Sequence, residues 1–368
     1  MTTSLRPYLF ILVATCVAFL SFIVIEPFSM RIDGDMYVSQ ITQFEAGELS
    51  PIPRDVALRA FKPFTGVWGS LLVPFITPVE ALQLLNLIFL VALPFVAFAF
   101  LREIHFSEEE ATWGALWITT GYPLLKYGLA IGTDLGSWLF ALLTAYLIVR
   151  AVRTNSGRSI FFASLIGFIG GTIKEPGVFG LIFGGLYILF TYKERALQAT
   201  MKFIAFLALP ALILEALLIG YLAYSGFPTF LDWYGQVTDG EFSEAHYQVF
   251  QLIPVLASAF SILLVYALVG FVAVLTKRVQ IQHAYALTFA LLLASLPVLM
   301  WKIFISRVLF IQFLFFVPMA LLGVRVLHAQ YSSKWANVLK VSLYVLPVLA
   351  SVGLFIISGK GSLFTILL

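Results

Sequence analysis

The sequence predicts an all-α, polytopic membrane protein with about eleven transmembrane helices. Of its 368 residues, 61% are hydrophobic and only 11% are charged, whereas soluble chains are about 45 to 50% apolar. Eleven spans of about 20 apolar residues would use roughly 220 residues, about 60% of the chain, which matches the hydrophobic fraction. We therefore expect residues 1–368 to form a single transmembrane domain without a large soluble domain.

Apolar stretches of spanning length alternate with polar or charged breaks along the chain. The first stretch has no small-residue cleavage site, so we expect it to be retained as the first helix. Residues 65–76 are apolar but too short to cross a bilayer, which predicts a short interfacial or re-entrant helix. The predicted spans are residues 8–27, 79–101, 109–125, 133–151, 159–173, 176–192, 202–224, 249–275, 283–300, 305–326 and 340–358.

The Lys and Arg residues of the short loops predict the orientation. With the N-terminus in the cytoplasm, most of the 22 Lys and Arg residues fall in cytoplasmic loops, as the positive-inside rule requires. Two long loops, residues 28–64 and 225–248, then lie on the extracytoplasmic side. The cytoplasmic face is expected to carry only loop charges of this positive-inside kind.

The first long loop contains a helical pattern. Tyr37, Ile41 and Phe44 recur at helical spacing after Asp33 and Asp35. Acidic residues favour helix N-termini and glycine favours C-termini, so the helix would begin at one of these acids and end at Gly47. The pattern predicts an amphipathic helix on the membrane surface.

Several functional classes are excluded by composition and motifs. The net charge of +3 is too small for a nucleic-acid footprint, and the one cysteine, Cys16, excludes disulfides. The chain has neither a GxSxG elbow nor a Walker-type loop, which removes serine hydrolases and ATP-driven pumps. Three of the four histidines are predicted to be cytoplasmic, so no zinc cluster is expected. No internal repeat of fixed period is visible, which counts against an inverted-repeat transporter.

The ionisable residues suggest where chemistry takes place. Burying such groups at a membrane is costly, so they are functional candidates by default. The predicted topology places a set of acids and bases from several loops at the extracytoplasmic face, and these residues are Asp33, Asp35, Arg54, Arg59, Lys62, Lys126, Asp134, Lys174, Glu175, Asp232, Asp239, Lys302 and Arg307.

The three most informative positions each have two interpretations. Asp33 or Asp35 is either a carboxylate that accepts a proton or holds a divalent cation, or merely a helix N-cap, and these residues alone favour the cap. Lys174 and Glu175 either form a local ion pair or, because Pro176 follows, point into an outward cavity. Arg307 either snorkels or binds phosphate through its planar fork.

Two glycine pairs have the spacing of close helix contacts. Gly167 and Gly171, and Gly180 and Gly184, are each separated by three residues. Because no strand precedes them, we interpret them as packing positions and not as ligand loops.

The order of these motifs resembles the GT-C glycosyltransferases, which are polytopic enzymes that use polyprenyl-phosphate-linked sugars at the extracytoplasmic face. Arg31-x-Asp33-Gly34-x-x-Tyr37 is similar to their first-loop acidic motif. The run from Arg59 to Pro63 is similar to the stretch that enters their second helix. Thr133-Asp134, Lys174-Glu175-Pro176 and Ser306-Arg307 resemble recurrent outer-face positions of the superfamily.

This resemblance implies an activity and roles for individual residues. The sugar would move from a polyprenyl-phosphate carrier to a hydroxyl of a glycan or lipid acceptor, by one inverting displacement with Asp33 as the base. Arg59, Lys174 and Arg307 would bind the carrier phosphate. Asp35, Asp134 and Glu175 would be supporting acids or help to hold a divalent cation (Mg²⁺ or Mn²⁺), and Tyr37, Trp233 and Tyr234 would contact acceptor or sugar.

The resemblance also implies a location, the inner membrane of a bacterium that contains undecaprenyl phosphate. Two other functions remain open. One is a lipid-linked sugar flippase or secondary transporter, for which Glu215 is the mid-span acid. The other is a non-catalytic subunit of an envelope-glycan assembly complex, in which the outer charges would be satisfied pairs.

Overall fold

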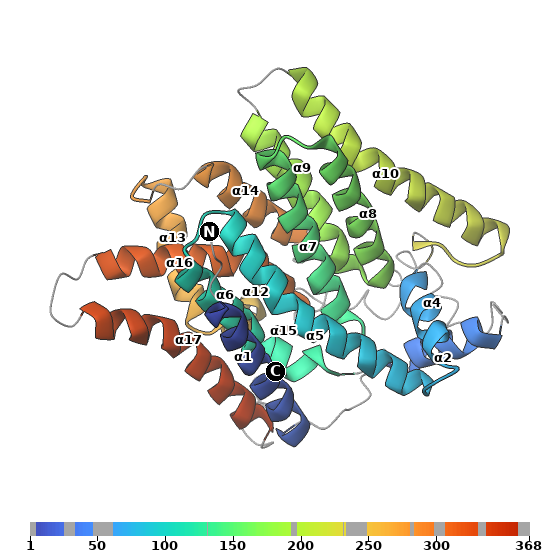
Figure 1. The fold of residues 1–368 in the computed structure, drawn as a ribbon, viewed down its shortest axis with the longest axis horizontal. Coiled ribbons are helices and arrows are strands. Elements are labelled where there is room, and N and C mark those ends of the chain that lie inside the picture. The colour runs from blue at the N-terminus through green and yellow to red at the C-terminus, as the bar shows by residue number, and fades with distance from the viewer. Residues whose placement is uncertain are drawn as a thin grey trace.

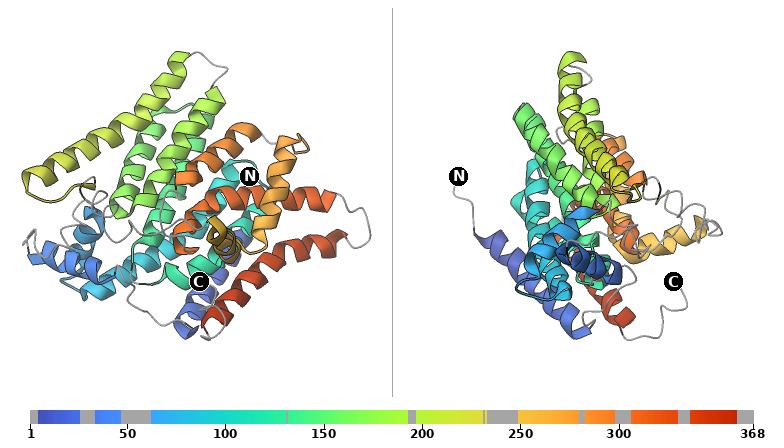
Figure 2. Two further views of the ribbon diagram at one scale, coloured as in Figure 1. Left: turned by 180° about the vertical axis from the view of Figure 1, so that it is seen from behind. Right: turned by 90° about the vertical axis from the view of Figure 1, so that its right-hand side faces the viewer.

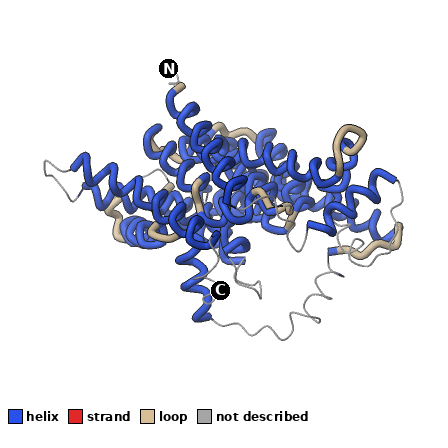
Figure 3. Tube along the Cα trace, turned by 90° about the horizontal axis from the view of Figure 1, so that it is seen from below, coloured by secondary structure: helices blue, strands red, loops and turns tan. Residues whose placement is uncertain are grey.

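The computed structural model describes residues 5–25, 34–46, 62–130, 132–192, 197–230, 232, 249–279, 283–297, 306–329 and 336–359. Within these ranges every regular element is helical (Figure 3). The elements are α1 (Arg6–Ile25), α2 (Gly34–Ala46), α4 (Pro63–Leu72), α5 (Pro78–Glu103), α6 (Glu108–Thr119), η1 (Leu124–Gly128), α7 (Asp134–Arg153), α8 (Gly157–Ile173), η2 (Glu175–Val178), α9 (Phe179–Tyr192), α10 (Leu197–Tyr224), α12 (Val249–Phe260), α13 (Leu263–Leu275), α14 (Ala284–Ser295), α15 (Ser306–Leu309), η4 (Phe310–Gln312), α16 (Phe313–Ala329) and α17 (Ala336–Gly359).

The described helices lie where the sequence places apolar stretches. Five of them are long and apolar enough to cross a membrane, or six if one bent pair counts as a single span. Four shorter apolar helices occupy further predicted spans. The all-α membrane architecture is thus confirmed, and the number of eleven spans stays a prediction.

Residues 249–275 do not form the single continuous helix that hydropathy predicts. The α12 and α13 segments meet at a bend of 97°. Ser261, between them, has a left-handed backbone with φ of +50°. A left-handed conformation costs about 1 to 2 kcal/mol for a residue other than glycine. The bend is invisible in hydropathy because the residues on both sides are apolar.

Two helix starts are determined by capping boxes. The hydroxyl of Thr77 accepts a hydrogen bond from the Glu80 backbone N–H, and the Glu80 carboxylate accepts one from the Thr77 backbone N–H. Ser107 and Glu110 form the same reciprocal pair at the start of α6. Each box satisfies donors that a helix N-terminus leaves without intrahelical partners.

The helices differ in how deeply they are buried. Most of the apolar stretches of α7 and α16 are buried, whereas little of those of α10 and α17 is. Figure 2 shows α10 and α17 along opposite margins of the molecule. The exposed leucine and valine side chains on these two helices, including Leu212, Leu217 and Leu349, are suited to contact lipid.

The closest helix packing joins α13 and α16. A β-carbon at Gly270 would overlap the backbone carbonyl of Met319, and one at Gly323 would overlap the backbone carbonyl of Tyr266. The two helices therefore pack backbone against backbone, which only glycine permits. The predicted glycine pair Gly180 and Gly184 behaves similarly, because both residues lie tightly against α7, at Ala141 and Ile148.

The first-loop helix α2 packs on protein. Tyr37 and Ile41 are fully buried and form a cluster with Leu82 of α5. Figure 1 shows α2 beside α4 at one end of α5. The helical period that the sequence analysis noted at Tyr37 and Ile41 thus reflects contact with α4 and α5.

Candidate active site at one end of the bundle

A carboxylate held between two cations marks one end of the helix bundle. The ammonium Nζ of Lys174 lies 2.8 Å from Oδ1 of Asp134. The guanidinium Nε of Arg307 lies 3.7 Å from Oδ2 of the same residue. Only 10% of the Asp134 side chain is exposed. These three residues come from segments far apart in the sequence, so the fold assembles an electrostatic centre there.

A second, buried ion pair adjoins this carboxylate. The ammonium of Lys62, which precedes α4, contacts the carboxylate of Glu175, and Lys62 has no exposed surface. Lys174 and Glu175 are neighbours, yet each contacts a different partner. The extended backbone of Lys174, with φ of −162° and ψ of 153°, turns the two side chains apart. Lys62, Asp134, Lys174, Glu175 and Arg307 together are the charged cluster.

The turn that carries Lys174 and Glu175 depends on two glycines. A β-carbon at Gly177 would overlap the backbone of Gly170, so η2 folds tightly onto the end of α8. The backbone N–H of Gly177 donates to the carbonyl of Lys174 at 2.9 Å. Pro176 is suited to this first helical turn because it has a fixed φ and no N–H to satisfy. The sequence thus builds a sharp corner with both charged side chains on it.

Asn86 holds the chain that leads into Asp134. Its side-chain amide donates to the backbone carbonyls of Ala130 and Gly132, both at 3.0 Å. Both N–H donors of this buried amide are therefore satisfied. Asp134 then begins α7, where the helix dipole favours a negative charge.

The position of Arg307 depends on aromatic packing against α7. Phe310, which follows α15, meets the ring of Trp138 edge to face with centroids 4.5 Å apart. Both rings are buried. An edge-to-face aromatic pair has a preferred geometry, so it fixes the start of the α15 to α16 segment relative to Asp134.

The first loop is connected to the charged cluster through α2. The side-chain amide of Gln40 donates to the backbone carbonyl of Lys62 at 3.2 Å. Asp35 lies exposed in the first turn of α2, and Tyr37 is fully buried. The ring of Tyr37 is therefore a packing element of the loop in this structure. Asp33 immediately precedes α2 and lies outside the described residues.

Glu175 remains ionised despite its surroundings. It lies in the connection between two predicted spans. Burial alone would raise its pKa, but the ammonium groups of Lys62 and Lys174 hold the pKa of this carboxyl below its usual value. The Glu175 carboxylate of the charged cluster is therefore anionic at neutral pH because cations surround it.

The structure brings together four of the residues to which the sequence analysis gave a role in the site, and it adds two more. Asp134, Lys174, Glu175 and Arg307 meet, whereas Asp33, Arg59, Trp233 and Tyr234 lie outside the described residues. Lys62 was among the charged candidates but had no role, and Asn86 was not predicted as a site residue. Their available signals are the position of Lys62 in the Arg59 to Pro63 run and the presence of a polar Asn86 within an apolar span.

The described part of the cluster does not fit a divalent cation. Among the described residues, no three His, Cys, Asp or Glu side chains gather closely enough to hold a metal ion. The two carboxylates of the cluster already have cationic partners in Lys62, Lys174 and Arg307. A metal site with three such protein ligands would therefore need at least one residue outside the described ranges.

The opposite end of the bundle carries ion pairs of its own. Glu103 pairs with Arg153, Glu110 with Arg325 and Glu109 with Lys340. The expectation that this face carries only positive-inside loop charges is therefore wrong. The acids at the end of α5 and in the first turn of α6 neutralise those bases.

Comparison with known proteins identifies the fold. No protein-family model and no curated protein sequence matches this chain. Solved structures of the oligosaccharyltransferase of Archaeoglobus fulgidus do match. The apo form has a TM-score of 0.63 at 9% identity, over 95% of this chain and 56% of that one. A complex of the enzyme, named AglB, with an inhibitory peptide and a dolichol-phosphate has a TM-score of 0.58 at 9% identity, over 97% and 56%.

A third structure of the same enzyme, in complex with Zn and sulfate, has a TM-score of 0.55 at 12% identity and covers 94% of this chain and 52% of that one. The chain thus spans little more than half the length of these proteins. At such low identity the likeness concerns the fold. The fold of this chain is therefore similar to that of about half of the archaeal oligosaccharyltransferase, and the predicted GT-C-like fold is confirmed at this level.

Proposed function

We propose that this protein is a membrane glycosyltransferase. It moves a sugar from a polyprenyl-phosphate carrier to a hydroxyl of a cell-envelope glycan or lipid. The reaction takes place at the extracytoplasmic face of a bacterial inner membrane. The observation that carries this proposal is the charged cluster, which lies at one end of a fold shared with an oligosaccharyltransferase.

The electrostatics of the cluster suit a phosphate leaving group. Negative charge grows on the carrier phosphate as the bond to the sugar breaks, and preorganised cations at a poorly hydrated site stabilise it. The Arg307 side chain is 20% exposed, whereas Asp134 is 10% exposed and the Nζ of Lys174 is buried. Asp134 therefore orients the two cations, the exposed part of the Arg307 side chain binds the phosphate, and the buried Lys174 ammonium adds positive charge beside it. Arg59 contributes a further cation in this proposal.

The transfer step is a single displacement. The carboxylate of Asp33 takes the proton of the acceptor hydroxyl, and the oxygen forms a bond to the anomeric carbon as the bond from that carbon to the phosphate oxygen breaks. The electron pair of that bond leaves with the polyprenyl phosphate, and the anomeric configuration inverts. The short distance along the chain from Asp33 to α2, and the Gln40 contact to Lys62, support a position of Asp33 near the cluster.

The competing transport function makes a different prediction about charge. A secondary transporter uses ionisable groups near the bilayer centre. In the described part of the chain, the ion pairs gather at the two ends of the bundle. Glu215 lies on α10, a helix that is mostly exposed. This distribution favours chemistry at one face over a pathway through the middle.

A transfer assay on the purified protein tests the proposal. Polyprenyl-phosphate-linked sugars with a radiolabelled sugar are incubated with envelope glycan and lipid acceptors, and products are separated from the donor. Transfer that falls in Arg307→Ala but persists in Lys340→Ala, whose charge lies at the other end of the bundle, supports the proposal. Movement of labelled donor across proteoliposomes without transfer would identify a flippase. If the protein neither transfers the sugar nor moves the donor across the membrane, the remaining function is that of a non-catalytic assembly subunit.

A further inference from the structure

A polar cavity lies at the end of the bundle opposite to the charged cluster. It has a volume of about 110 Å³, and its polar lining consists of Glu103, His105, Arg153, Tyr187, Thr191 and His283. These residues come from the end of α5, the turn after it, the end of α7, α9 and the start of α14. Asp134 and Arg153 are the two ends of α7, so the cavity is roughly 30 Å from the cluster at 1.5 Å per residue.

The cavity wall offers several hydrogen-bond donors. Arg153 pairs with Glu103, with Nε 2.6 Å from Oε1 and Nη2 donating to Oε2 at 3.2 Å. This ion pair balances the charge of Glu103, although Oε1 accepts no hydrogen bond from the described residues, and 55% of the Arg153 side chain stays exposed. The hydroxyl oxygen of Thr191 is buried without a hydrogen-bond partner among the described residues. A buried polar atom of this kind costs free energy unless something fills its hydrogen-bonding capacity.

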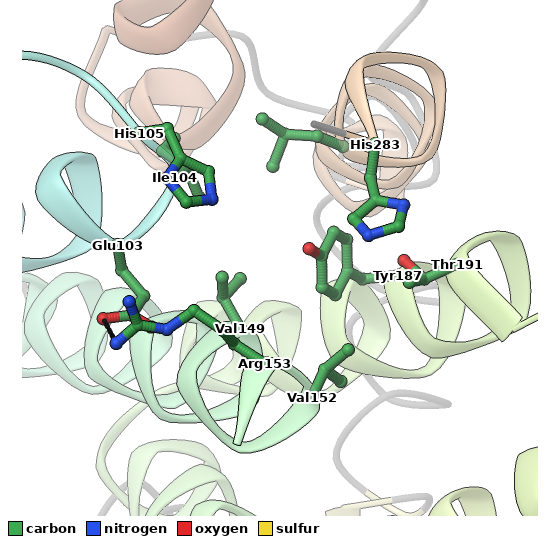
Figure 4. Close-up of a pocket in the computed structure, with 10 residues that line it drawn as sticks. Glu103, Ile104, His105, Val149, Val152, Arg153, Tyr187, Thr191 and His283 are labelled. Carbon is green, nitrogen blue, oxygen red and sulfur yellow. Dashed lines mark hydrogen bonds and ion pairs between the residues drawn. The ribbon is translucent and has the colours of Figure 1, made fainter. Parts of the chain in front are cut away.

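Both histidines of the wall have strained backbones. His105 has φ of +69° and His283 has φ of +56°. His105 is the left-handed residue that ends α5, because the backbone N–H of Phe106 donates to the carbonyl of Leu101 at 3.1 Å, and His283 directly precedes α14. Figure 4 shows the His105 ring and the Glu103–Arg153 pair on one side of the space, and Tyr187, Thr191 and His283 on the other. The two imidazoles thus face one cavity from separate loops.

The lining selects a class of ligand. Glu103, His105 and His283 do not lie close enough together to hold a metal ion. The volume is several times what one water molecule requires, so a compact polyatomic ligand fits. Guanidinium, imidazole and hydroxyl groups can all donate to oxygen, and the charged guanidinium of Arg153 favours anionic oxygen. We propose that this cavity binds a phosphate-like oxyanion, which is either a free ion or the phosphate of a lipid headgroup.

Direct binding to the purified full-length protein in detergent tests the proposal. Inorganic phosphate and sulfate are titrated calorimetrically, and saturable binding at one site is expected. His105→Asn and His283→Asn remove the imidazole but keep a residue that tolerates left-handed backbone. Each change should weaken binding about tenfold or more. His328→Asn is the matched control, because His328 does not line the cavity.

A second variant guards against misfolding. Thr191→Val keeps the side-chain shape and removes only the hydroxyl that has no partner, so the unliganded protein should melt at the wild-type temperature while binding weakens several-fold. A short-chain phosphatidic acid distinguishes the sources. If phosphatidic acid and inorganic phosphate compete for binding, the cavity is a phosphate site that both can reach. If phosphatidic acid binds and inorganic phosphate does not, the cavity is a site for a lipid headgroup.

Two results would overturn the proposal. The first is that neither probe binds saturably. The second is that both probes bind with affinities that are unchanged in the His105, His283 and Thr191 variants, which would indicate an adventitious ion only. Arg307→Ala should leave this binding intact, because Arg307 belongs to the charged cluster and not to this cavity. The result is therefore independent of the proposed transfer function.

Discussion

Lys174 contacts Asp134 across 2.8 Å, although the carboxylate of Glu175 is the nearest acid along the chain. Glu175 instead neutralises Lys62, from the segment that enters α4. One corner of backbone between α8 and α9 therefore binds two distant parts of the protein. The charged cluster is a structural junction as well as a candidate site, and substitutions can separate these roles.

The buried pair of Lys62 and Glu175 should behave as a coupled unit. Lys62→Met removes the main partner of the Glu175 carboxylate, and Glu175→Gln removes the negative charge that the buried Lys62 ammonium contacts. Removing one partner of a buried ion pair typically costs about 3 to 5 kcal/mol. The double variant should lose less stability than the sum of the two single variants. Unfolding in detergent, followed by circular dichroism, measures this, and additive losses would show that the pair is not coupled.

Arg307 should affect donor use and not folding. Loss of a charge-assisted contact to phosphate costs about 1.5 to 3 kcal/mol, on the order of 10 to 100-fold in affinity. Arg307→Ala should therefore weaken use of the lipid-linked donor with little change in melting temperature, and Arg59→Ala should do the same. Initial rates over a donor concentration series give the measurement. Unchanged donor dependence in either variant would mean that its arginine only snorkels.

Asp33 and Asp35 can be distinguished by amide substitution. Asn caps a helix about as well as Asp, so Asp33→Asn should be silent if Asp33 is only the cap of α2. If Asp33 is the base, the transfer rate should fall by about 10² to 10⁴-fold, because an amide cannot accept the proton. We expect Asp33→Asn to abolish transfer at a normal melting temperature and Asp35→Asn, whose side chain is exposed, to do less. Near-normal transfer by Asp33→Asn would direct the search for a base to Asp35, Asp134 or Glu175.

The predicted orientation can be measured on single-cysteine variants. Cys16 is the one native cysteine, and it is replaced before new cysteines are introduced. Cysteines at positions 155 and 283 should react with a membrane-impermeant reagent only from the cytoplasm, because the positive-inside rule places them there. Cysteines at 47 and 238 should react from outside. Labelling of position 47 from the cytoplasm alone would invert the topology and remove the proposed face of catalysis.

The sequence predicts the helices well because their signal is local. An apolar stretch bounded by a capping box, as at Thr77 and Glu80, specifies both the helix and its start. The bend at Ser261 leaves no such trace, because apolar residues flank it and a left-handed serine has no sequence signature. The predicted number of spans is affected by the same cause, because hydropathy reports the length of an apolar stretch and not whether its helix bends.

The candidate site is predictable as a list of residues and not as a set of partners. Excess charge at one predicted face singled out Asp134, Lys174, Glu175 and Arg307. Which charge meets which depends on side-chain direction at the extended Lys174 and on contacts across 113 residues, as between Lys62 and Glu175. Such pairings are set by tertiary packing, and a single sequence carries no record of them.

The contact between Gly270 and Gly323 links distant backbone packing to the alignment of Arg307. Gly323 lies on the segment that begins near Arg307, roughly 24 Å further along at 1.5 Å per residue. Neither glycine has room for a methyl group, so an alanine at either one would have to shift α16 against α13. Arg307 would move with the helix and lose its alignment with Asp134. Substitutions at the contact between α13 and α16 should therefore reduce activity, although this contact lies away from the charged cluster.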